Sequence, residues 1–294
     1  MSILIDKNSK FIIQGITGSQ GSFHTKLMLE GGTKIAAGVV PGKAGKKVEG
    51  IPVYDKISDA MQKHEASWSI LFVPASFVKA AALEALDAGL NIVIITEHIP
   101  VHDTLAIIKF AKEKGEELDK KLYIVGPNCP GLITPEESKA GILPSKIFKK
   151  GNVGVVSRSG TLTYEIVWEL SKRDIGQSTC VGIGGDPVIG SDFIDILKLF
   201  EKDKDTKQIV LIGEIGGSLE ERAAEYIEKN ISKPVISYIA GCTAPSGKTM
   251  GHAGALVLGA CGSAKSKIKA LEIAGVEVAK LPSGVGRILE NKIK

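Results

Sequence analysis

Short apolar runs alternate with longer amphipathic segments along most of this chain. In the first 125 residues, the apolar runs are typical of buried strands and the amphipathic segments of helices. The predicted strands are 11–14, 35–40, 69–73, 90–96 and 122–125, and the predicted helices are 22–29, 77–87 and 103–114. Continuous apolar strands separated by helices indicate a parallel sheet that is covered on both faces.

The same alternation restarts after a segment of about 25 residues that is rich in proline and glycine (126–150). The second set comprises strands 153–157, 179–183, 208–212, 234–239 and 276–280, with helices near 161–173, 192–201, 219–229, 264–273 and 285–293. We therefore predict two open, doubly wound α/β domains, 1–127 and 128–294, as the length of 294 residues also suggests.

Composition narrows the class of protein. The chain is 44% hydrophobic and 24% charged, as globular proteins are, which excludes a disordered chain. A net charge of +4 and 5% aromatic residues argue against nucleic-acid binding. Four cysteines without a CxxC pair predict neither a zinc site nor a disulfide framework. Asp6 and Lys7 interrupt the N-terminal apolar run, and no apolar run reaches 18 residues. A cytoplasmic protein without a membrane partner is expected.

A glycine-rich turn follows the first predicted strand and opens the first helix. It contains Gly15, Gly18 and Gly21, a placement typical of phosphate-binding turns at a helix N-terminus. Its G-x-x-G-x-x-G spacing differs from the dinucleotide pattern G-x-G-x-x-G. The alternative is a tight turn without a ligand.

The end of the second strand indicates which ligand this turn would take. NAD enzymes usually place a carboxylate there to bind the ribose hydroxyl. This chain has GVVPGKAGKK instead, with Lys43, Lys46 and Lys47. A cationic loop suits an additional phosphate on the adenosine ribose, as in NADP or coenzyme A (CoA). The alternative is a solvated lysine-rich loop.

The second half contains three candidate features. Ser159, Gly160 and Thr161 begin a helix and form either a second anion site or an ordinary N-cap. His252 lies in an irregular, glycine-rich segment (240–262), where it could act as a nucleophile toward a phosphoryl group. Glu214 follows a buried strand and could hold one imidazole nitrogen; the alternative is a charge at the N-terminus of the next helix.

Nine sequence blocks, in order over nearly the whole chain, resemble the α subunit of succinyl-CoA synthetase, or succinate–CoA ligase. They are GITGSQG, VVPGKAG, FVPASF, IITEHIP, GPNCPG, VSRSGTLTYE, GQSTCVGIGGDP, IGEIGG and TAPSGKTMGHAGA. The resemblance implies a Rossmann-like CoA-binding domain followed by a flavodoxin-like domain that carries a phosphohistidine. The implied reaction is succinate + CoA + nucleoside triphosphate ⇌ succinyl-CoA + nucleoside diphosphate + phosphate, through succinyl phosphate.

The resemblance also assigns residues to roles. His252 is the implied phosphohistidine and Glu214 its carboxylate partner. The implied CoA contacts are Thr17, Gly18, Ser19, Gln20, Lys43, Ile95, Thr96, Glu97, Asn128 and Cys129. Ser159 and Gly160 would cradle the phosphoryl group, and Tyr164 would lie near succinate.

A β subunit is implied as partner, in an αβ or α2β2 assembly. It would supply the nucleotide site with its Mg²⁺, and no P-loop or metal site is expected on this chain. Two departures from the family stand out. Phe148 occupies the place of a second histidine of bacterial members, and Lys112–Lys121 resembles a charged surface insertion.

Three other interpretations remain open at this point. The first is the α subunit of a related ligase acting on malate or citrate. The second is a non-catalytic CoA-binding protein, against which the glycine setting of His252 argues. The third is an NADP oxidoreductase, for which the glycine spacing is wrong.

Overall fold

The computed structural model describes residues 2–244, 250–256 and 262–293, and these form two compact units. The N-terminal unit comprises Ile5–Leu143 and Val188–Gly190. The C-terminal unit comprises residues up to Leu4, Pro144–Pro187 and the chain from Ser191 onward. By this division residues 128–143 pack with the N-terminal unit, and the expected domain boundary after residue 127 stays a prediction.

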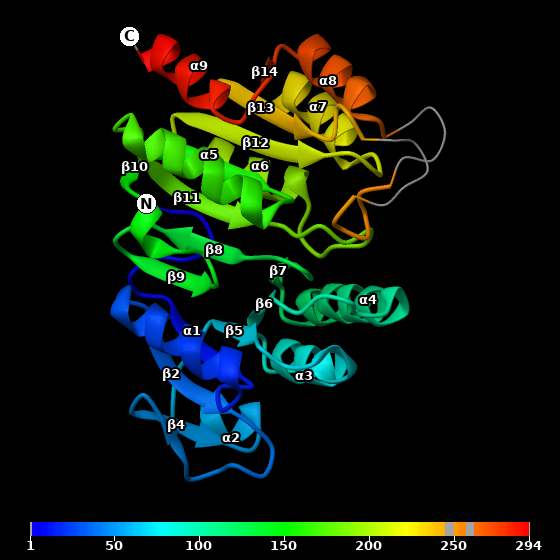
Figure 1. Cartoon of the computed structure of the whole chain (residues 1–294). Helices are drawn as coiled ribbons and strands as arrows, with labels where there is room; N and C mark the ends of the chain where they lie inside the picture. Colours follow the sequence, from blue (N-terminus) through cyan, green and yellow to red (C-terminus); the bar gives the residue numbers. More distant parts are fainter. Residues whose placement is uncertain (1, 245–249, 257–261, 294) are drawn as a thin grey trace. The chain divides into compact units, whose positions relative to one another are not determined.

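The N-terminal unit contains a sheet with the strand order β3-β4-β2-β1-β5-β6-β7. Figure 1 labels β2, β4, β5, β6 and β7 of this sheet. Its strands are β1 (Lys10–Gln14), β2 (Lys34–Val39), β3 (Lys47–Val48), β4 (Ile51–Tyr54), β5 (Trp68–Leu71), β6 (Asn91–Ile94) and β7 (Ile124–Val125). All pairs are parallel except β3 with β4. Without β3, the order is that of a Rossmann fold, which reverses direction between β1 and β5.

Four helices cover this sheet: α1 (Ser19–Glu30), α2 (Ile57–Met61), α3 (Ala75–Asp87) and α4 (Val101–Glu117). One buried apolar cluster joins the strands to α2, α3 and α4 through side chains such as Ile57, Val78 and Ile107. Helix α1 packs on β1, β2 and β9. These apolar faces recur at helical spacing, which is why the sequence pattern located the three longer helices.

A hairpin of β8 (Gly131–Thr134) and β9 (Ser138–Gly141) lies in the segment that the sequence indicated only as a junction. Gly131 has a φ of +88°, and a Cβ there would lie 1.9 Å from the carbonyl oxygen of Ala140. The Oγ1 of Thr134 donates to the carbonyl of Ile5 at 2.8 Å, which ties the hairpin to the start of its unit.

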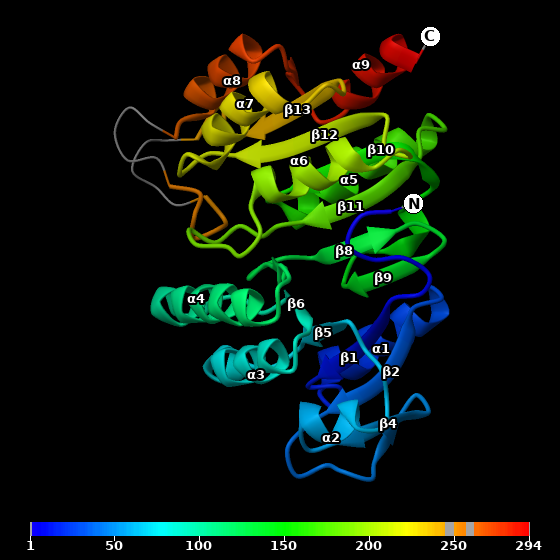
Figure 2. The same cartoon turned by 180° about the vertical axis from the view of Figure 1, so that it is seen from behind.

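The C-terminal unit contains five parallel strands in the order β14-β13-β12-β10-β11. They are β10 (Lys150–Ser157), β11 (Gln177–Gly182), β12 (Gln208–Glu214), β13 (Val235–Ala240) and β14 (Glu277–Ala279). This is the flavodoxin order, in which the direction of winding reverses between the first and third strands, here β10 and β12. The carboxyl ends of these strands lie along one edge (Figures 1 and 2).

The helices of this unit are η1 (Ser145–Ile147), α5 (Gly160–Lys172), α6 (Phe193–Lys202), α7 (Leu219–Asn230), α8 (Ala264–Ile273) and α9 (Gly284–Ile293). Helix α5 packs with α9, and α7 packs with both α6 and α8. Two groups of helices are expected for a doubly wound sheet, whose two faces are both apolar.

The predicted fold class is confirmed, including the Rossmann-like and flavodoxin-like strand orders. Each long strand and helix predicted from the sequence is present within a few residues of its predicted bounds. The predicted surface insertion Lys112–Lys121 does not lie wholly between a helix and a strand, because α4 continues to Glu117; whether it is an insertion stays a prediction. None of the helices in the described residues is both long enough and apolar enough to cross a bilayer.

Candidate active site

The glycine turn after β1 places free backbone amides at the start of α1. Gly15 has a φ of +80°, and a Cβ there would lie 2.4 Å from the carbonyl oxygen of Phe72. Gly18 is the N-cap residue and provides no side chain to the helix amides, and the first turn has no acidic residue. Ser19 and Gln20 open the helix with exposed side chains. The turn therefore leaves an exposed helix N-terminus available to an anion.

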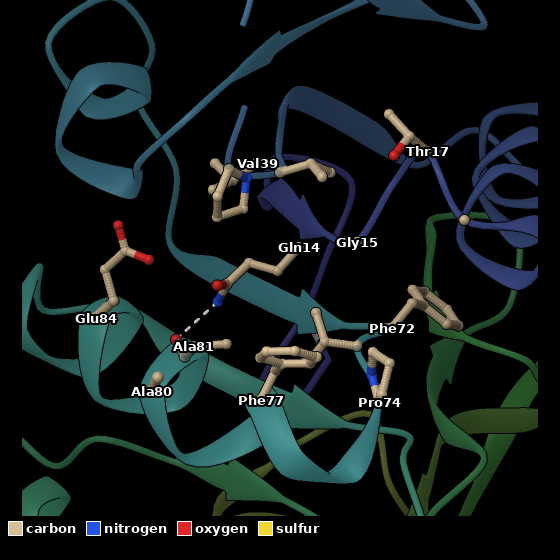
Figure 3. A pocket seen from close by; sticks show the side chains of 14 residues that line it. Gln14, Gly15, Thr17, Val39, Phe72, Pro74, Phe77, Ala80, Ala81 and Glu84 are labelled. Carbon is tan, nitrogen blue, oxygen red and sulfur yellow. Dashed lines mark hydrogen bonds between the residues drawn. The ribbon is translucent and has the colours of Figure 1, made fainter. Parts of the chain in front are cut away.

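An open pocket of about 490 Å³ lies beside this turn, at the reversal point between β1 and β5. Figure 3 shows its walls, which include Thr17, Val39, Phe72, Pro74 and Phe77. Near its floor, the amide of Gln14 donates to the carbonyl of Ala81 at 2.9 Å. A largely apolar pocket of this size with a few polar groups is typical of a small-molecule site.

Lys43 lies in the exposed loop after β2, two residues beyond Pro41 in the pocket wall. The backbone amides of Lys43 and Ala44 both donate to one oxygen of Asp55, at 3.0 Å each. Asp55 therefore fixes the loop, a role that the sequence analysis missed because Asp55 follows a strand that it had not predicted. The ammonium of Lys43 lies on an exposed side chain.

The ends of β6 and β7 bring together the remaining predicted CoA contacts. The Oγ1 of Thr96 donates to the carbonyl of Val73 at 2.7 Å, and Val73 lines the pocket. The backbone amide of Asn128 donates to the carbonyl of Thr96 at 3.0 Å. Cys129 is buried, with its Sγ 3.3 Å from the carbonyl of Ile94, so it packs inside the unit. Ile95 is half-buried and Glu97 exposed on the same segment.

In the C-terminal unit, the predicted pair of His252 and Glu214 is in contact. The Nδ1 of His252 lies 3.0 Å from each carboxylate oxygen of Glu214. A carboxylate at this position accepts, so Nδ1 carries the proton and Nε2 is left with a lone pair. Glu214 ends β12 with its side chain 8% exposed, whereas the side chain of His252 is 27% exposed and so within reach of a substrate.

Glycines and charges shape the surroundings of the imidazole. A Cβ on Gly185 would lie 2.2 Å from Nδ1 of His252, so the imidazole keeps this position only beside a glycine. The hydrogen bond to Glu214 raises the pKa of His252, burial opposes this, and the charges of Arg158 and Asp186 lower and raise it respectively. The pocket for the imidazole thus combines a carboxylate acceptor with a nearby cation.

The start of α5 holds the predicted phosphate residues. Ser159 is the N-cap, and its Oγ accepts from the amide of Leu162 at 3.3 Å. Gly160 begins the helix, and the half-buried Tyr164 follows in its next turn. The cap bond agrees with the alternative of an ordinary N-cap, and it leaves the role of Ser159 toward a phosphoryl group a prediction.

A buried network behind Glu214 was not predicted from the sequence. Arg158, Glu220 and Lys267 are each at most 2% exposed. Nη1 of Arg158 lies 3.0 Å from a carboxylate oxygen of Glu220, and the ammonium of Lys267 contacts the other oxygen. Arg158 directly follows the β10 strand end, which is the only signal in the sequence that could have identified it.

The remaining part of the glycine-rich segment, 245–249 and 257–261, lies outside the described residues, and so does Cys261. Of the other cysteines, Cys129 and Cys180 are buried and Cys242 is exposed.

Comparison with known families agrees with this division of sites. Residues 6–98 match the CoA binding domain family, and residues 156–277 match the CoA-ligase family. The first range contains the glycine turn and the pocket. The second contains Glu214, His252 and the buried network.

Curated relatives match over the full length. A succinate–CoA ligase [ADP-forming] subunit alpha 2 from Archaeoglobus fulgidus is 55% identical over 98% of this chain and 99% of that protein. The subunit alpha of a succinate–CoA ligase [ADP-forming] from Staphylococcus epidermidis is 54% identical over 100% of this chain and 96% of that protein.

Solved structures share the fold. An ATP citrate lyase from Methanosaeta concilii in complex with (3S)-citryl-CoA matches with a TM-score of 0.88 and 26% identity, over 99% of this chain and 51% of that one. A dinucleotide forming acetyl-coenzyme A synthetase 1 from Ca. Korarchaeum cryptofilum matches with a TM-score of 0.73 and 23% identity, over 93% of this chain and 58% of that one. The chain thus spans just over half the length of each of these structures. The resemblance noted in the sequence is confirmed, and this chain belongs to the family of ADP-forming succinate–CoA ligase α subunits.

Proposed function

We propose that this chain is the α subunit of an ADP-forming succinate–CoA ligase, with His252 as its phosphoryl carrier. The observation that carries the proposal is the contact of Nδ1 of His252 with Glu214, which leaves Nε2 as the nucleophile. A β subunit would bring ATP and its Mg²⁺, as an αβ or α2β2 assembly. The malate and citrate alternatives differ only in the acid that accepts the phosphoryl group.

The reaction proceeds in three transfers. Nε2 of His252 attacks the γ-phosphorus of ATP, and ADP leaves with the electrons of the broken P–O bond. A carboxylate oxygen of succinate then takes the phosphoryl group and frees the imidazole. The thiolate of CoA finally attacks the acyl carbon of succinyl phosphate, forming the thioester and releasing phosphate. A covalent carrier divides one difficult transfer into easier ones.

Glu214 and the start of α5 act on the charges that develop in these steps. The carboxylate of Glu214 keeps the proton on Nδ1 and stabilises the positive charge on the ring as the P–N bond forms. The N-terminal amides of α5, beginning at Gly160, favour an anion at that end of the helix. Ser159 and Tyr164 would lie beside the phosphoryl group and succinate.

CoA would bind to the N-terminal unit. The apolar pocket between Pro41 and Phe77 suits the adenine ring of CoA. The phosphates of CoA would bind at the start of α1, at Thr17, Gly18, Ser19 and Gln20. Lys43 would approach the phosphate on the ribose. Ile95, Thr96, Glu97, Asn128 and Cys129, at the ends of β6 and β7, would line the path of the pantetheine arm.

Phosphoryl labelling tests the proposal. The chain and its β subunit, incubated with ATP labelled in the γ-phosphoryl group, should incorporate label that is stable in alkali and lost in acid, as a phosphohistidine is. Succinate and CoA together should discharge the label, whereas malate or citrate with CoA should not. The variant His252→Asn should remain unlabelled. Equal labelling of this variant and the wild type would exclude His252 as the carrier.

A further inference from the structure

Arg158 lies at the centre of the buried network behind the His252–Glu214 pair. Its Nη2 is 3.5 Å from a carboxylate oxygen of Glu214, and its Nη1 is 3.1 Å from the carbonyl of Gly216 and 3.0 Å from Glu220. The guanidinium is 2% exposed, so these interactions are little screened by water. Arg158 thus joins the strand end of β12 to the first turns of α7.

Glu220 and Lys267 complete the network. Glu220 accepts from the backbone amide of Glu214 at 3.1 Å and from Nη1 of Arg158, and its other oxygen contacts Lys267. The ammonium of Lys267 also donates to the carbonyl of Gly216 at 2.7 Å. The two cations and the two carboxylates balance, which is what permits four charged groups to be buried together.

The network holds Glu214 at three points and also limits the loop of His252. Glu214 is held at its amide by Glu220, at its carbonyl by Nη1 of Arg158 at 3.5 Å, and at its carboxylate by Nη2. A Cβ on Gly254, two residues after His252, would lie 2.9 Å from Nη2 of Arg158. One guanidinium therefore lies against both Glu214 and the backbone of the loop that carries His252.

We propose that Arg158, supported by Glu220 and Lys267, is a positioning residue that orients Glu214 toward His252 and places a positive charge behind this pair. This inference rests on the proposed function, because it concerns the nucleophile named there. Among the described residues, the charged groups that act on His252 are Glu214 at the end of β12, Arg158 after β10 and Asp186 after β11. Of these, only Arg158 carries a positive charge that favours the neutral ring.

The guanidinium serves the reaction in two ways. Its positive charge offsets part of the rise in the pKa of His252 that Glu214 and Asp186 cause. As a result, Nε2 is unprotonated and nucleophilic in a larger fraction of molecules near neutral pH. Its planar fork aims at the carboxylate and a carbonyl at once, which a lysine cannot reproduce. Removal of the charge and removal of the fork therefore have different consequences.

The test compares Arg158→Gln, Arg158→Lys and the control Arg222→Gln, each in complex with the β subunit. Arg222 is in the same unit and forms an ion pair with Asp192 at 3.2 Å, but it is 55% exposed. Two quantities are measured against pH: the titration of His252 by NMR of chains with ¹³C-labelled histidine, and the rate of its phosphorylation by ATP. The signal of His252 is assigned from its absence in His252→Asn.

We expect Arg158→Gln to move the titration midpoint of His252 upward by about half a pH unit or more and to lower the rate at pH 7 at least fivefold. Arg158→Lys should keep the midpoint near that of the wild type and lower the rate at every pH. Arg222→Gln should change neither quantity. An unchanged titration in Arg158→Gln would overturn the proposal, as would a raised KM for succinate with unchanged kcat, which would place Arg158 on the substrate.

A second variant covers the case in which Arg158→Gln does not fold. The double variant Arg158→Gln/Glu220→Gln removes one charge of each sign and should still raise the His252 midpoint, by less than the single variant does, because the loss of the Glu220 carboxylate opposes the loss of the nearer guanidinium. No shift would again overturn the proposal. The titration needs no activity, so it remains informative if the wild type is not phosphorylated. A wild type that is not phosphorylated by ATP would contradict the proposed function, whereas the titration would still test the role of Arg158.

Discussion

His252 and Glu214 face each other at the carboxyl edge of the C-terminal sheet, with the imidazole Nδ1 3.0 Å from both carboxylate oxygens. The two residues are 38 positions apart in the sequence, and the contact forms because the described residues around His252, 250–256, lie at the end of β12. A symmetric contact with both oxygens fixes the plane of the ring as well as its tautomer. The pair is therefore built to present Nε2 in one direction.

Glu214→Gln should lower the rate of His252 phosphorylation at least 100-fold. The amide keeps the shape of the side chain but loses the charge, and its NH2 group can turn toward Nδ1 and favour the wrong tautomer. The measurement is single-turnover labelling from succinyl-CoA and phosphate, beside CoA binding by calorimetry. CoA affinity should stay unchanged, since the proposed CoA contacts are in the N-terminal unit. If Glu214→Gln were labelled as fast as the wild type but had lost its CoA affinity, Glu214 would not be the partner of His252.

Lys43→Glu should weaken binding of CoA more than binding of dephospho-CoA, which lacks the phosphate on the ribose. A charged hydrogen bond to phosphate supports roughly a tenfold difference at low salt, and the difference should shrink as salt screens the exposed side chain. Calorimetric titration of both ligands gives the ratio. Lys34→Glu, an exposed change at the opposite end of β2, serves as the control. Equal weakening of the two ligands by Lys43→Glu would place its ammonium away from that phosphate.

Lys139→Met should stabilise the protein at pH 7. Lys139 is 2% exposed in β9, and burial lowers its pKa from the usual value of 10.5 to about 8, although Glu30 opposes the shift. The unfolded chain therefore binds more protons than the folded one between pH 8 and 10.5, and stability rises with pH over that interval.

The gain in melting temperature from Lys139→Met should accordingly be largest below pH 8 and should decline toward pH 10.5. Thermal unfolding followed at pH 7 and pH 10 provides the comparison. Lys26→Met, on the exposed side of α1, should change neither temperature. A variant that is less stable than the wild type at pH 7 would show that the ammonium of Lys139 contributes more by its interactions than it costs by burial.

The strands and helices of both units could be predicted because each buries a continuous apolar run or one apolar face. The short elements could not. Strand β4 has four residues with only Val53 buried, and β9, SKAG, is fully buried without an apolar pattern. The hairpin of β8 and β9 depends on the close approach of Gly131 to Ala140, which no local pattern encodes.

The residues of the functional site also differ in whether the sequence could identify them. His252 and Glu214 could be proposed because each has a local sign, a glycine setting and a strand end. Arg158 and Glu220 are 62 positions apart, and Lys267 and Glu220 are 47 apart, so their pairing depends on how β10, α7 and α8 pack. Buried charges of this kind have no periodic signature, and only the tertiary structure reveals which cation meets which carboxylate.

Gly185→Ala should abolish phosphorylation of His252 while leaving the fold and CoA binding intact. Gly185 follows β11 without a positive φ, so alanine is compatible with its backbone, but the added Cβ would lie 2.2 Å from Nδ1 and 2.3 Å from Cγ of the imidazole. The ring is partly exposed and belongs to a loop, so it is the group that yields. Its displacement breaks the hydrogen bond to Glu214 and turns Nε2 away, at a cost in rate of 100-fold or more.

Gly284→Ala is the matched control, because a Cβ there would make only ordinary contact, 3.5 Å from Ala279, at the start of α9. Labelling by ATP, melting temperature and CoA affinity are compared among the three proteins. Gly185→Ala should lose only the label, and Gly284→Ala should match the wild type in all three. Full labelling of Gly185→Ala would mean that the imidazole reacts from a different position than the one in contact with Glu214, and the assignment of Nε2 as nucleophile would fall with it.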